Sequence, residues 1–207
     1  MIKIKVCGIT NLEDALAAAE LGADALGFVL APSPRQVTPE VLRRLVAGLP
    51  PFISKVGVFV DSPLDEVRRI MSDCGLDLAQ LHGSESPEYC QALFPRAIKA
   101  FQVKDATVLK QLPLYQVSAY LLDGYHTKLK GGSGQSFDWE IARQAGGRGH
   151  IILSGGLTPE NVARAIAIAR PYGVDVSSGV EASPGKKDHH KLTAFIHAVK
   201  ESEGEAA

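Results

Sequence analysis

The chain has 207 residues, of which 45% are hydrophobic and 22% are charged, and its formal net charge is -1. This composition is typical of a globular domain with one substantial core and argues against a basic nucleic-acid-binding domain. No apolar run approaches the roughly 20 residues that span a bilayer, so we expect no membrane partner. We expect one domain over 1–207, with a frayed polar tail over about 201–207.

The cysteines are Cys7, Cys74 and Cys90. Their number is odd, they form no CxxC pair, and the N-terminal residues lack the apolar segment of a signal peptide. We therefore expect free thiols in the reducing environment of the cytoplasm.

The first expected strand, over about 2–7, alternates apolar and polar side chains and ends at a cysteine. Because strand side chains alternate between faces, Lys3, Lys5 and Cys7 share one face and the apolar residues share the other. We interpret the polar face as the interior side of a sheet, with chemistry at the end where Cys7 lies. The alternative is a small cysteine that only fills the core.

Further apolar, β-branched runs follow, and a helical pattern comes after each of them. We expect strands over about 2–7, 24–30, 53–60, 77–82, 96–101, 118–123, 150–154 and 173–177. We expect helices over about 11–21, 39–48, 63–74, 86–94, 104–111, 137–145, 158–169 and 187–200. Four of the expected helix starts carry a Ser-Pro or Thr-Pro pair. Such a pair favours the start of a helix, because the hydroxyl can cap a free N–H and proline fits the first turn. These pairs begin at Thr38, Ser62, Ser86 and Thr158.

The strict alternation of strand and helix predicts a parallel sheet. Eight such units favour a closed (β/α)8 barrel, the TIM barrel of the α/β class, over an open doubly wound sheet. In these barrels the active site lies at the carboxyl ends of the strands. The candidate residues at those ends are Cys7, Arg35, Asp61, His82, Asp123, Ser154–Gly156 and Ser177–Gly179.

The last two strands run into small residues, Gly155–Gly156 after one and Ser177–Gly179 after the other. Glycine lets backbone N–H groups approach an anion, and a helix N-terminus adds favourable partial charge. In TIM barrels this pair of loops often binds phosphate. We therefore expect a phosphate site here, against the alternative of plain flexible turns.

Two charged residues at strand ends suit acid–base chemistry and anion binding. Asp123 ends the sixth expected strand, where a carboxylate can act as a general acid; its alternative use is to cap a loop. Arg35 lies in a Pro-flanked loop after the second expected strand, and its planar guanidinium can clamp a carboxylate. The alternative for Arg35 is an exposed surface arginine.

Other polar residues have simpler interpretations. We interpret His82 as a structural histidine, and Lys99 lies before the end of its strand, which argues against a Schiff-base role. The glycine-rich loop over 124–135 is expected to act as a lid, or else to be a plain surface loop. His189–His190 has no second ligand cluster at metal spacing, so we predict no metal site.

In combination these motifs resemble the phosphoribosylanthranilate isomerase family. The resemblance extends over nearly the whole chain, and the order of its motifs is more specific than any single one. Its strongest stretches are Lys5–Thr10, Gly22–Val29, Val56–Val60, Gln80–Gly83, Leu122–Asp123, Gly131–Gly134, Phe137–Trp139, Leu153–Leu157 and Asp175–Glu181.

The resemblance implies a cofactor-free, single-domain isomerase of tryptophan biosynthesis. It would convert N-(5-phosphoribosyl)anthranilate into 1-(2-carboxyphenylamino)-1-deoxy-D-ribulose 5-phosphate by an Amadori rearrangement. The implied general base is Cys7, the implied general acid is Asp123, and Arg35 would engage the anthranilate carboxylate. The residues implied in phosphate binding are Gly132, Gly156, Ser178 and Gly179.

One departure from the family pattern lies at Gln36, where family members often carry an aromatic residue. A cysteine thiol also needs a lowered pKa to act as a base near neutral pH. We expect the inward-facing Lys5 and Lys3 to supply the positive potential that lowers it.

Two other function classes stay open at this level. Another phosphosugar barrel enzyme is one, although an epimerase would need metal ligands at strand ends and an indole-forming synthase a Lys–Glu pair. The other is a non-catalytic barrel that binds a phosphosugar, which needs neither Cys7 nor Asp123. The sequence is compatible with both a monomer and a homodimer.

Overall fold

The computed structural model describes residues 1–124 and 137–204 of the chain. Eight parallel strands pair in sequence order, and the last pairs with the first, which closes a barrel. These strands are β1 (Lys3–Cys7), β2 (Ala25–Val29), β3 (Ser54–Phe59), β4 (Leu78–Leu81), β5 (Ala97–Val103), β6 (Ala119–Gly124), β7 (Ile151–Leu153) and β8 (Gly173–Val176). The predicted single-domain (β/α)8 barrel is therefore confirmed.

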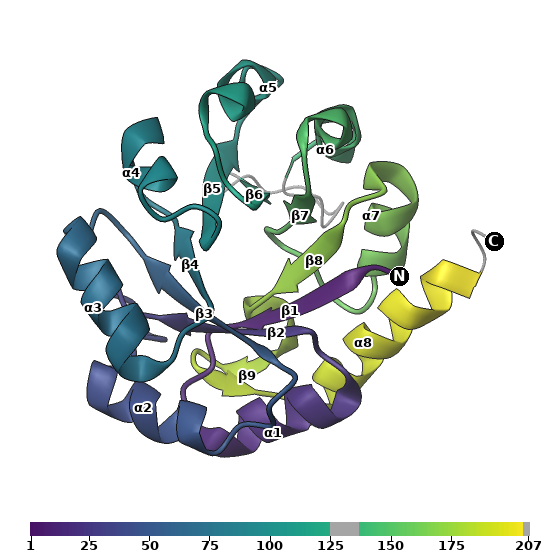
Figure 1. Cartoon of the computed structure of the whole chain (residues 1–207). Coiled ribbons are helices and arrows are strands. Elements are labelled where there is room, and N and C mark those ends of the chain that lie inside the picture. Colours follow the sequence, from purple (N-terminus) through teal and green to yellow (C-terminus); the bar gives the residue numbers. More distant parts are fainter. Residues whose placement is uncertain (125–136, 205–207) are drawn as a thin grey trace.

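In the described part of the chain, eight α-helices form a ring outside the strands (Figure 1). They are α1 (Leu12–Leu21), α2 (Pro39–Ala47), α3 (Leu64–Cys74), α4 (Pro87–Gln91), α5 (Val108–Gln111), α6 (Trp139–Ala145), α7 (Val162–Ala169) and α8 (His189–Gly204). None of them is long and apolar enough to cross a bilayer.

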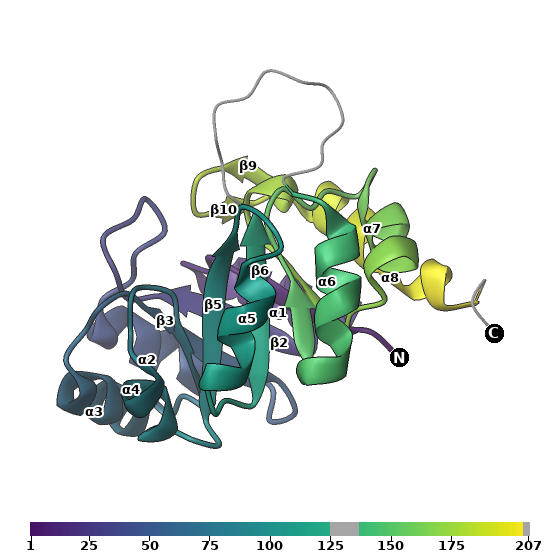
Figure 2. The ribbon, with the colours of Figure 1, turned by 90° about the horizontal axis from the view of Figure 1, so that it is seen from above.

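A short antiparallel hairpin, β9 (Glu181–Ser183) and β10 (Lys186–Lys187), lies between β8 and α8. Figure 2 shows it at the end of the barrel to which β5 points. The sequence predicts no hairpin here and places the start of the last helix at 187, because strands this short carry no periodic pattern. Short 3-10 turns add to the loops, at η1 (Leu112–Leu114), η2 (Gly146–Arg148) and η3 (Ser178–Val180).

Two of the four predicted Ser-Pro and Thr-Pro helix starts behave as expected. The hydroxyl of Thr38 accepts a hydrogen bond from the Val41 N–H at 3.4 Å, and the hydroxyl of Ser86 accepts one from the Tyr89 N–H at 3.3 Å. Both helices begin at the proline that follows the capping residue. The sequence signal thus predicts the start of α2 to the residue and the start of α4 to within one residue.

The other two starts are wrong in detail. Helix α3 is preceded by Pro63 in extended conformation, and the hydroxyl of Ser62 does not cap it. Helix α7 begins four residues after Thr158, because the Asn161 side chain accepts a hydrogen bond from the Thr158 N–H at 2.8 Å. That bond holds 158–161 in a turn and delays the helix.

Helices α5 and α8 differ in length from the prediction, and α4 ends at Gln91 instead of 94. Helix α5 occupies only the end of the expected 104–111 segment, since the Asp105 carboxylate accepts a hydrogen bond from the Thr107 N–H at 2.8 Å and forms a turn there. Helix α8 continues to Gly204, so 201–204 is helical although we expected a frayed tail. Residues 205–207 lie outside the described residues.

The polar face of β1 turns toward the barrel interior, as predicted. Ile4 and Val6 belong to the hydrophobic core shared with the helices, whereas Lys5 and Cys7 lie on the opposite face and are 4% and 7% exposed. A separate apolar cluster fills the interior beneath them. It consists of Val56, Ile98, Ala100, Ala119, Leu121 and Ile152.

A buried ion pair links the loops after β3 and β4 to β5. Lys99 Nζ lies 2.7 Å from Glu85 Oε2, and the side chains are only 3% and 2% exposed. Glu85 also accepts hydrogen bonds from the N–H groups of Asp61 and Gly83, each at 3.0 Å. Because Lys99 is enclosed by these partners, its role is to fix two loops at the carboxyl end of the barrel.

Replacement of Lys99 by Met should lower the free energy of unfolding by about 3–5 kcal/mol, because it leaves the Glu85 carboxylate buried without its partner. Urea denaturation followed by circular dichroism measures this loss. Arg143→Met is the matched control, since Arg143 pairs with Glu140 at the surface and should cost less than about 1 kcal/mol. Equal losses in the two variants would contradict the structural role of the buried pair.

Candidate active site

A cavity of about 300 Å³ opens at the carboxyl ends of the barrel strands. Six of the seven residues predicted to form the site line it, namely Cys7, Arg35, Asp123, Gly156, Ser178 and Gly179. The seventh, Gly132, and the expected lid over 124–135 lie outside the described residues except for Gly124. The fold therefore gathers six residues that are scattered from position 7 to position 179.

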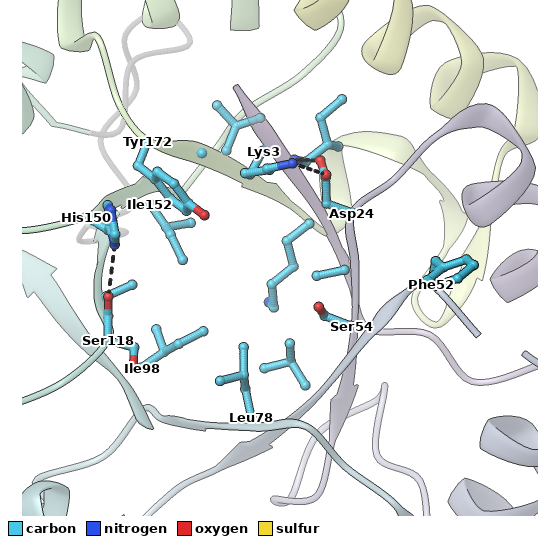
Figure 3. A pocket seen from close by; sticks show the side chains of 17 residues that line it. Lys3, Asp24, Phe52, Ser54, Leu78, Ile98, Ser118, His150, Ile152 and Tyr172 are labelled. Carbon is cyan, nitrogen blue, oxygen red and sulfur yellow. Dashed lines mark hydrogen bonds and ion pairs between the residues drawn. The ribbon is translucent and has the colours of Figure 1, made fainter. Parts of the chain in front are cut away.

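Another cavity, of about 380 Å³, lies at the opposite end of the barrel, where the strands begin (Figure 3). Its wall includes apolar residues such as Ile98 and Ile152, and its rim carries an ion pair between Lys3 and Asp24. This larger cavity contains none of the six predicted site residues that the structure describes. We therefore assign the chemistry to the cavity at the carboxyl end, as the barrel architecture requires.

Cys7 lies at the end of β1, opposite Gly27 of β2. A side chain at position 27 would meet both Cys7 Sγ and Lys5 Nζ within 3.0 Å, so this glycine provides the space that the two groups share. Burial raises the pKa of the Cys7 thiol above its ordinary value, and the positive charge of Lys5 opposes that effect without cancelling it. The expectation of a lowered pKa is therefore wrong for the protein alone.

Lys3 does not contribute to the potential at Cys7 in the way we expected. Its Nζ lies 2.8 Å from Asp24 Oδ1 at the other end of the barrel, and its side chain is 45% exposed. Of the two inward lysines predicted to act on Cys7, only Lys5 reaches the site. The alternation of β1 predicts the face of each side chain correctly, but Lys3 lies four residues before Cys7, which is about 13 Å along the strand and too deep to act on the thiol.

Lys5 forms a buried ion pair with Asp175 of β8. The Nζ lies 2.7 Å from Asp175 Oδ1, and the side chains are 5% and 6% exposed. Burial disfavours the charged form of Lys5, but the charge of Asp175 and of the neighbouring Cys7 raises its pKa overall. Ser154 Oγ donates a hydrogen bond to the other carboxylate oxygen at 3.0 Å. Sequence reasoning missed a role for Asp175, and the available signal was a charged residue between two valines in β8.

Asp123 lies beside His82 in the wall of the cavity. His82 Nε2 lies 3.3 Å from Asp123 Oδ2, and both side chains are about one quarter exposed. The other ring nitrogen of His82, Nδ1, lies 2.9 Å from Gln80 Nε2, and Gln80 is buried. The sequence favours a structural histidine at position 82, whereas the structure places His82 in the cavity wall beside the predicted acid.

Arg35 lines the cavity and packs its side chain over Gly8, where any side chain would meet Arg35 Cδ at 2.6 Å. Its Nε and Nη2 lie 2.8 Å and 2.6 Å from the two carboxylate oxygens of Glu181. The hydrogen bonds to Glu181 raise the pKa of Arg35, so it stays cationic. Gln36, the departure from the family pattern, forms an isolated bridge to Val29 that fixes this loop to β2.

The loops after β7 and β8 form the glycine-rich wall of the cavity. Gly155 and Gly156 adopt φ values of 86° and 68°, in the left-handed region that favours glycine. A side chain on Gly179 would collide with the carbonyl oxygen of Leu157, so the two loops touch through their backbones. Backbone amides without intervening side chains are what an anion site needs.

The described residues contain no group of three or more His, Cys, Asp or Glu side chains that could hold a metal ion. The chemical groups in the cavity are instead a thiol, a carboxyl group beside an imidazole, a guanidinium and a glycine-rich backbone. Such a set can exchange protons and bind two separate anionic groups.

Comparison with known proteins agrees with this chemistry. The family model described as N-(5'-phosphoribosyl)anthranilate (PRA) isomerase matches residues 4–198. A protein of Geobacter sp. (strain M21) named N-(5'-phosphoribosyl)anthranilate isomerase is 56% identical over 201 residues, which cover 97% of this chain and 98% of that protein.

Solved structures give the same result. A phosphoribosylanthranilate isomerase in complex with reduced 1-(o-carboxyphenylamino)-1-deoxyribulose 5-phosphate superposes with a TM-score of 0.87 at 42% identity and covers 97% and 100% of the two chains. Monomeric forms of the dimeric enzyme from Thermotoga maritima give a TM-score of 0.85 at 42% identity, with the same coverage. The chain therefore belongs to the phosphoribosylanthranilate isomerase family.

Proposed function

We propose that this chain carries out the Amadori rearrangement of its family with Cys7 as the general base and Asp123 as the general acid. The activity is an isomerisation in tryptophan biosynthesis, and its substrate is N-(5'-phosphoribosyl)anthranilate. The observation that carries the assignment of roles is that one cavity is lined by Cys7, Asp123, Arg35 and both glycine-rich loops. A relative at 42% identity binds a reduced product analogue, which supports the same substrate class here.

In the first step Asp123, in its protonated form, donates its proton to the ribose ring oxygen. The bond between that oxygen and C1 breaks, and the nitrogen lone pair forms the double bond of a protonated Schiff base. Asp123 becomes a carboxylate, and His82 Nε2, at 3.3 Å from Asp123 Oδ2, is positioned to stabilise this charge. The step needs a proton donor in reach of the sugar and no redox cofactor.

In the second step Cys7, as a thiolate, removes the proton from C2. The C–H electrons form a C1–C2 double bond, and those of the C=N bond return to nitrogen, which gives an enolamine. The enolamine tautomerises to the ketone as O2 loses a proton and C1 gains one, and proton exchange with solvent returns Asp123 to the acid and Cys7 to the thiolate. Protons taken and given balance over the cycle, so the reaction is an isomerisation without net proton uptake.

Cys7 can act as a base only as a thiolate, whereas burial favours its neutral thiol form. Another group must therefore stabilise the thiolate. Lys5 is the group that contributes most to the opposite effect, and Asp175 keeps Lys5 in place at 2.7 Å. We assign to Lys5 the stabilisation of the thiolate during proton transfer. Pairing with Asp175 also keeps Lys5 protonated, which a buried lysine alone would not be.

The two ends of the substrate would be held far from the reacting carbons. Arg35 would bind the anthranilate carboxylate, and the backbone of Gly156, Ser178 and Gly179 would bind the phosphate. Binding energy at these ends can then be used to position C1 and C2 between the acid and the base. Gly132 stays a prediction, since it lies outside the described residues.

We further propose that two copies of the chain associate through the face of the barrel where the strands begin. Phe52, in the loop before β3, is fully exposed, and Tyr172 at the same face is 44% exposed. Both residues line the cavity shown in Figure 3, and Phe52 stands clear of its other walls. An exposed phenylalanine beside an apolar cavity is typical of an interface, and the related Thermotoga maritima enzyme is described as dimeric.

Cys7→Ser and Asp123→Asn should each lower kcat by about 100-fold to 10,000-fold, because each removes one proton-transfer group. The measurement follows the fluorescence of freshly generated phosphoribosylanthranilate during turnover. Cys74→Ser and Asp73→Asn are the matched controls, since they make the same changes outside the cavity. Full activity of Cys7→Ser would show that another group is the base, and an inactive parent chain that still binds the product analogue would favour a sensor.

The pH dependence of Cys7 alkylation by iodoacetamide tests the role of Lys5. In the parent, the rate should rise at a higher pH than it does for an ordinary exposed thiol, because burial raises the pKa of Cys7. Lys5→Met should move the profile to higher pH, since the positive charge of Lys5 favours the thiolate. Peptide mass spectrometry separates Cys7 from Cys74, whose profile serves as the internal reference. An unchanged Cys7 profile in Lys5→Met would contradict this assignment.

Sedimentation velocity tests the proposed dimer. The parent should sediment as twice the 22.1 kDa chain at micromolar concentration, and Phe52→Ser should sediment as a monomer. Val60→Ser is the control, because Val60 follows β3 at the opposite end of the barrel and is also an exposed apolar residue. A parent chain that is monomeric at every concentration would refute the proposal.

A further inference from the structure

Three charged side chains meet where the hairpin β9–β10 packs against the loop after β2. Arg35 donates from Nε and Nη2 to the two oxygens of Glu181, at 2.8 Å and 2.6 Å. Lys187 Nζ lies 3.1 Å from Glu181 Oε1 on the other side. We call Arg35, Glu181 and Lys187 the charged triad; the hairpin that carries two of its members lies at the carboxyl end of the barrel in Figure 2.

Exposure differs sharply within the charged triad. The side chain of Arg35 is 23% exposed, whereas those of Glu181 and Lys187 are 5% and 0% exposed. Only the arginine therefore reaches the cavity with a substantial part of its surface. The buried Glu181 pairs with Arg35, and the buried Lys187 pairs with Glu181.

The geometry of the guanidinium decides what Glu181 can do. Arginine has five N–H groups in a rigid plane, and a carboxylate can bind one of its edges with two parallel hydrogen bonds. Glu181 takes the edge formed by Nε and Nη2. The edge formed by Nη1 and the second N–H of Nη2 is then available for another carboxylate in the same plane.

The carboxylate of Glu181 is itself held firmly. Burial works against its ionisation, but hydrogen bonds from Arg35 and the charge of Lys187 outweigh burial and lower its pKa. The Gly185 N–H also donates to Glu181 Oε1 at 3.3 Å. With two cations and one anion, the charged triad has one excess positive charge, which matches a single substrate carboxylate.

We propose that Glu181 is a positioning residue that fixes the guanidinium plane of Arg35 and so presents the free edge to the substrate carboxylate. This inference rests on the proposed function of Arg35. A competing arrangement, in which Glu181 merely occupies Arg35 until the substrate displaces it, would strand a buried carboxylate and is disfavoured for that reason. The two arrangements predict opposite effects of neutralising Glu181.

Lys187 connects the charged triad to the base. Its Nζ donates to the backbone carbonyl oxygens of Cys7 at 2.6 Å and of Ser177 at 3.2 Å. The end of β1 and the loop after β8 are therefore tied to the group that orients Arg35. A shift of Glu181 would move Arg35, which would bind the substrate carboxylate, relative to Cys7. The distance between Arg35 and the proposed base therefore depends on Glu181.

Glu181→Gln tests the proposal because it keeps the size of the side chain and removes its charge. KM for phosphoribosylanthranilate should rise about 10-fold to 100-fold, as expected for a weakened charged hydrogen bond, while kcat changes less than about 3-fold. Competitive inhibition by anthranilate should weaken in parallel. Inhibition by inorganic phosphate should stay the same, because Glu181 contacts the loop after β8 through its backbone N–H, which bonds to the Ser178 carbonyl oxygen and is kept in the variant. Glu66→Gln, on the exposed face of α3, is the matched control.

A double-mutant cycle separates positioning from general destabilisation. If Glu181 acts through Arg35, adding Glu181→Gln to Arg35→Ala should leave KM within about 2-fold of the single Arg35→Ala variant. Glu181→Asp, which keeps the charge, should recover part of the lost affinity and guards against a misfolded Gln variant. A lower KM in Glu181→Gln would establish the competing arrangement, and additive effects in the cycle would refute positioning. A parent chain without isomerase activity would instead refute the proposed function itself.

Discussion

The ion pair between Lys5 and Asp175 lies at the seam where the last strand meets the first, and the site depends on it. The register of β1 against β8 sets these two residues side by side, and Ser154 of the preceding unit bonds to the same carboxylate. Neither charge is tolerable in the interior without the other. Correct closure of the barrel is therefore the condition under which both are satisfied, and Cys7, two residues further along the same face of β1, is placed by that same register.

The charges around the cavity are arranged in compensated sets. Lys5 is paired with Asp175, and Glu181 lies between Arg35 and Lys187. This arrangement allows several ionised groups within a small volume, since each buried charge has an opposite partner. Two groups in the cavity can then attract an anion, namely the exposed edge of Arg35 and the backbone N–H groups of the glycine-rich loops. A substrate with a carboxylate at one end and a phosphate at the other would fit this arrangement.

The sequence predicts the barrel and most of its candidate site, because both follow from short-range periodicity and one rule of architecture. Alternation in β1 identifies the inward face, and strand ends identify Cys7 and Asp123. The rest depends on pairs far apart in the chain. Glu181 meets Arg35 across 146 positions, and Asp175 meets Lys5 across 170, which no local pattern reveals. The direction of the Cys7 pKa shift also escapes a sequence, since it depends on how burial balances the charge of Lys5.

The contact between Lys187 and Cys7 spans 180 positions, from the first strand to the hairpin before the last helix. During synthesis on the ribosome, Cys7, the proposed base, is made 180 positions before the lysine that binds its carbonyl oxygen. A nascent chain that ends before the hairpin contains Cys7 and Arg35 but lacks Glu181 and Lys187, which fix the distance between them. The proposed substrate site can therefore be complete only after the hairpin has been synthesised.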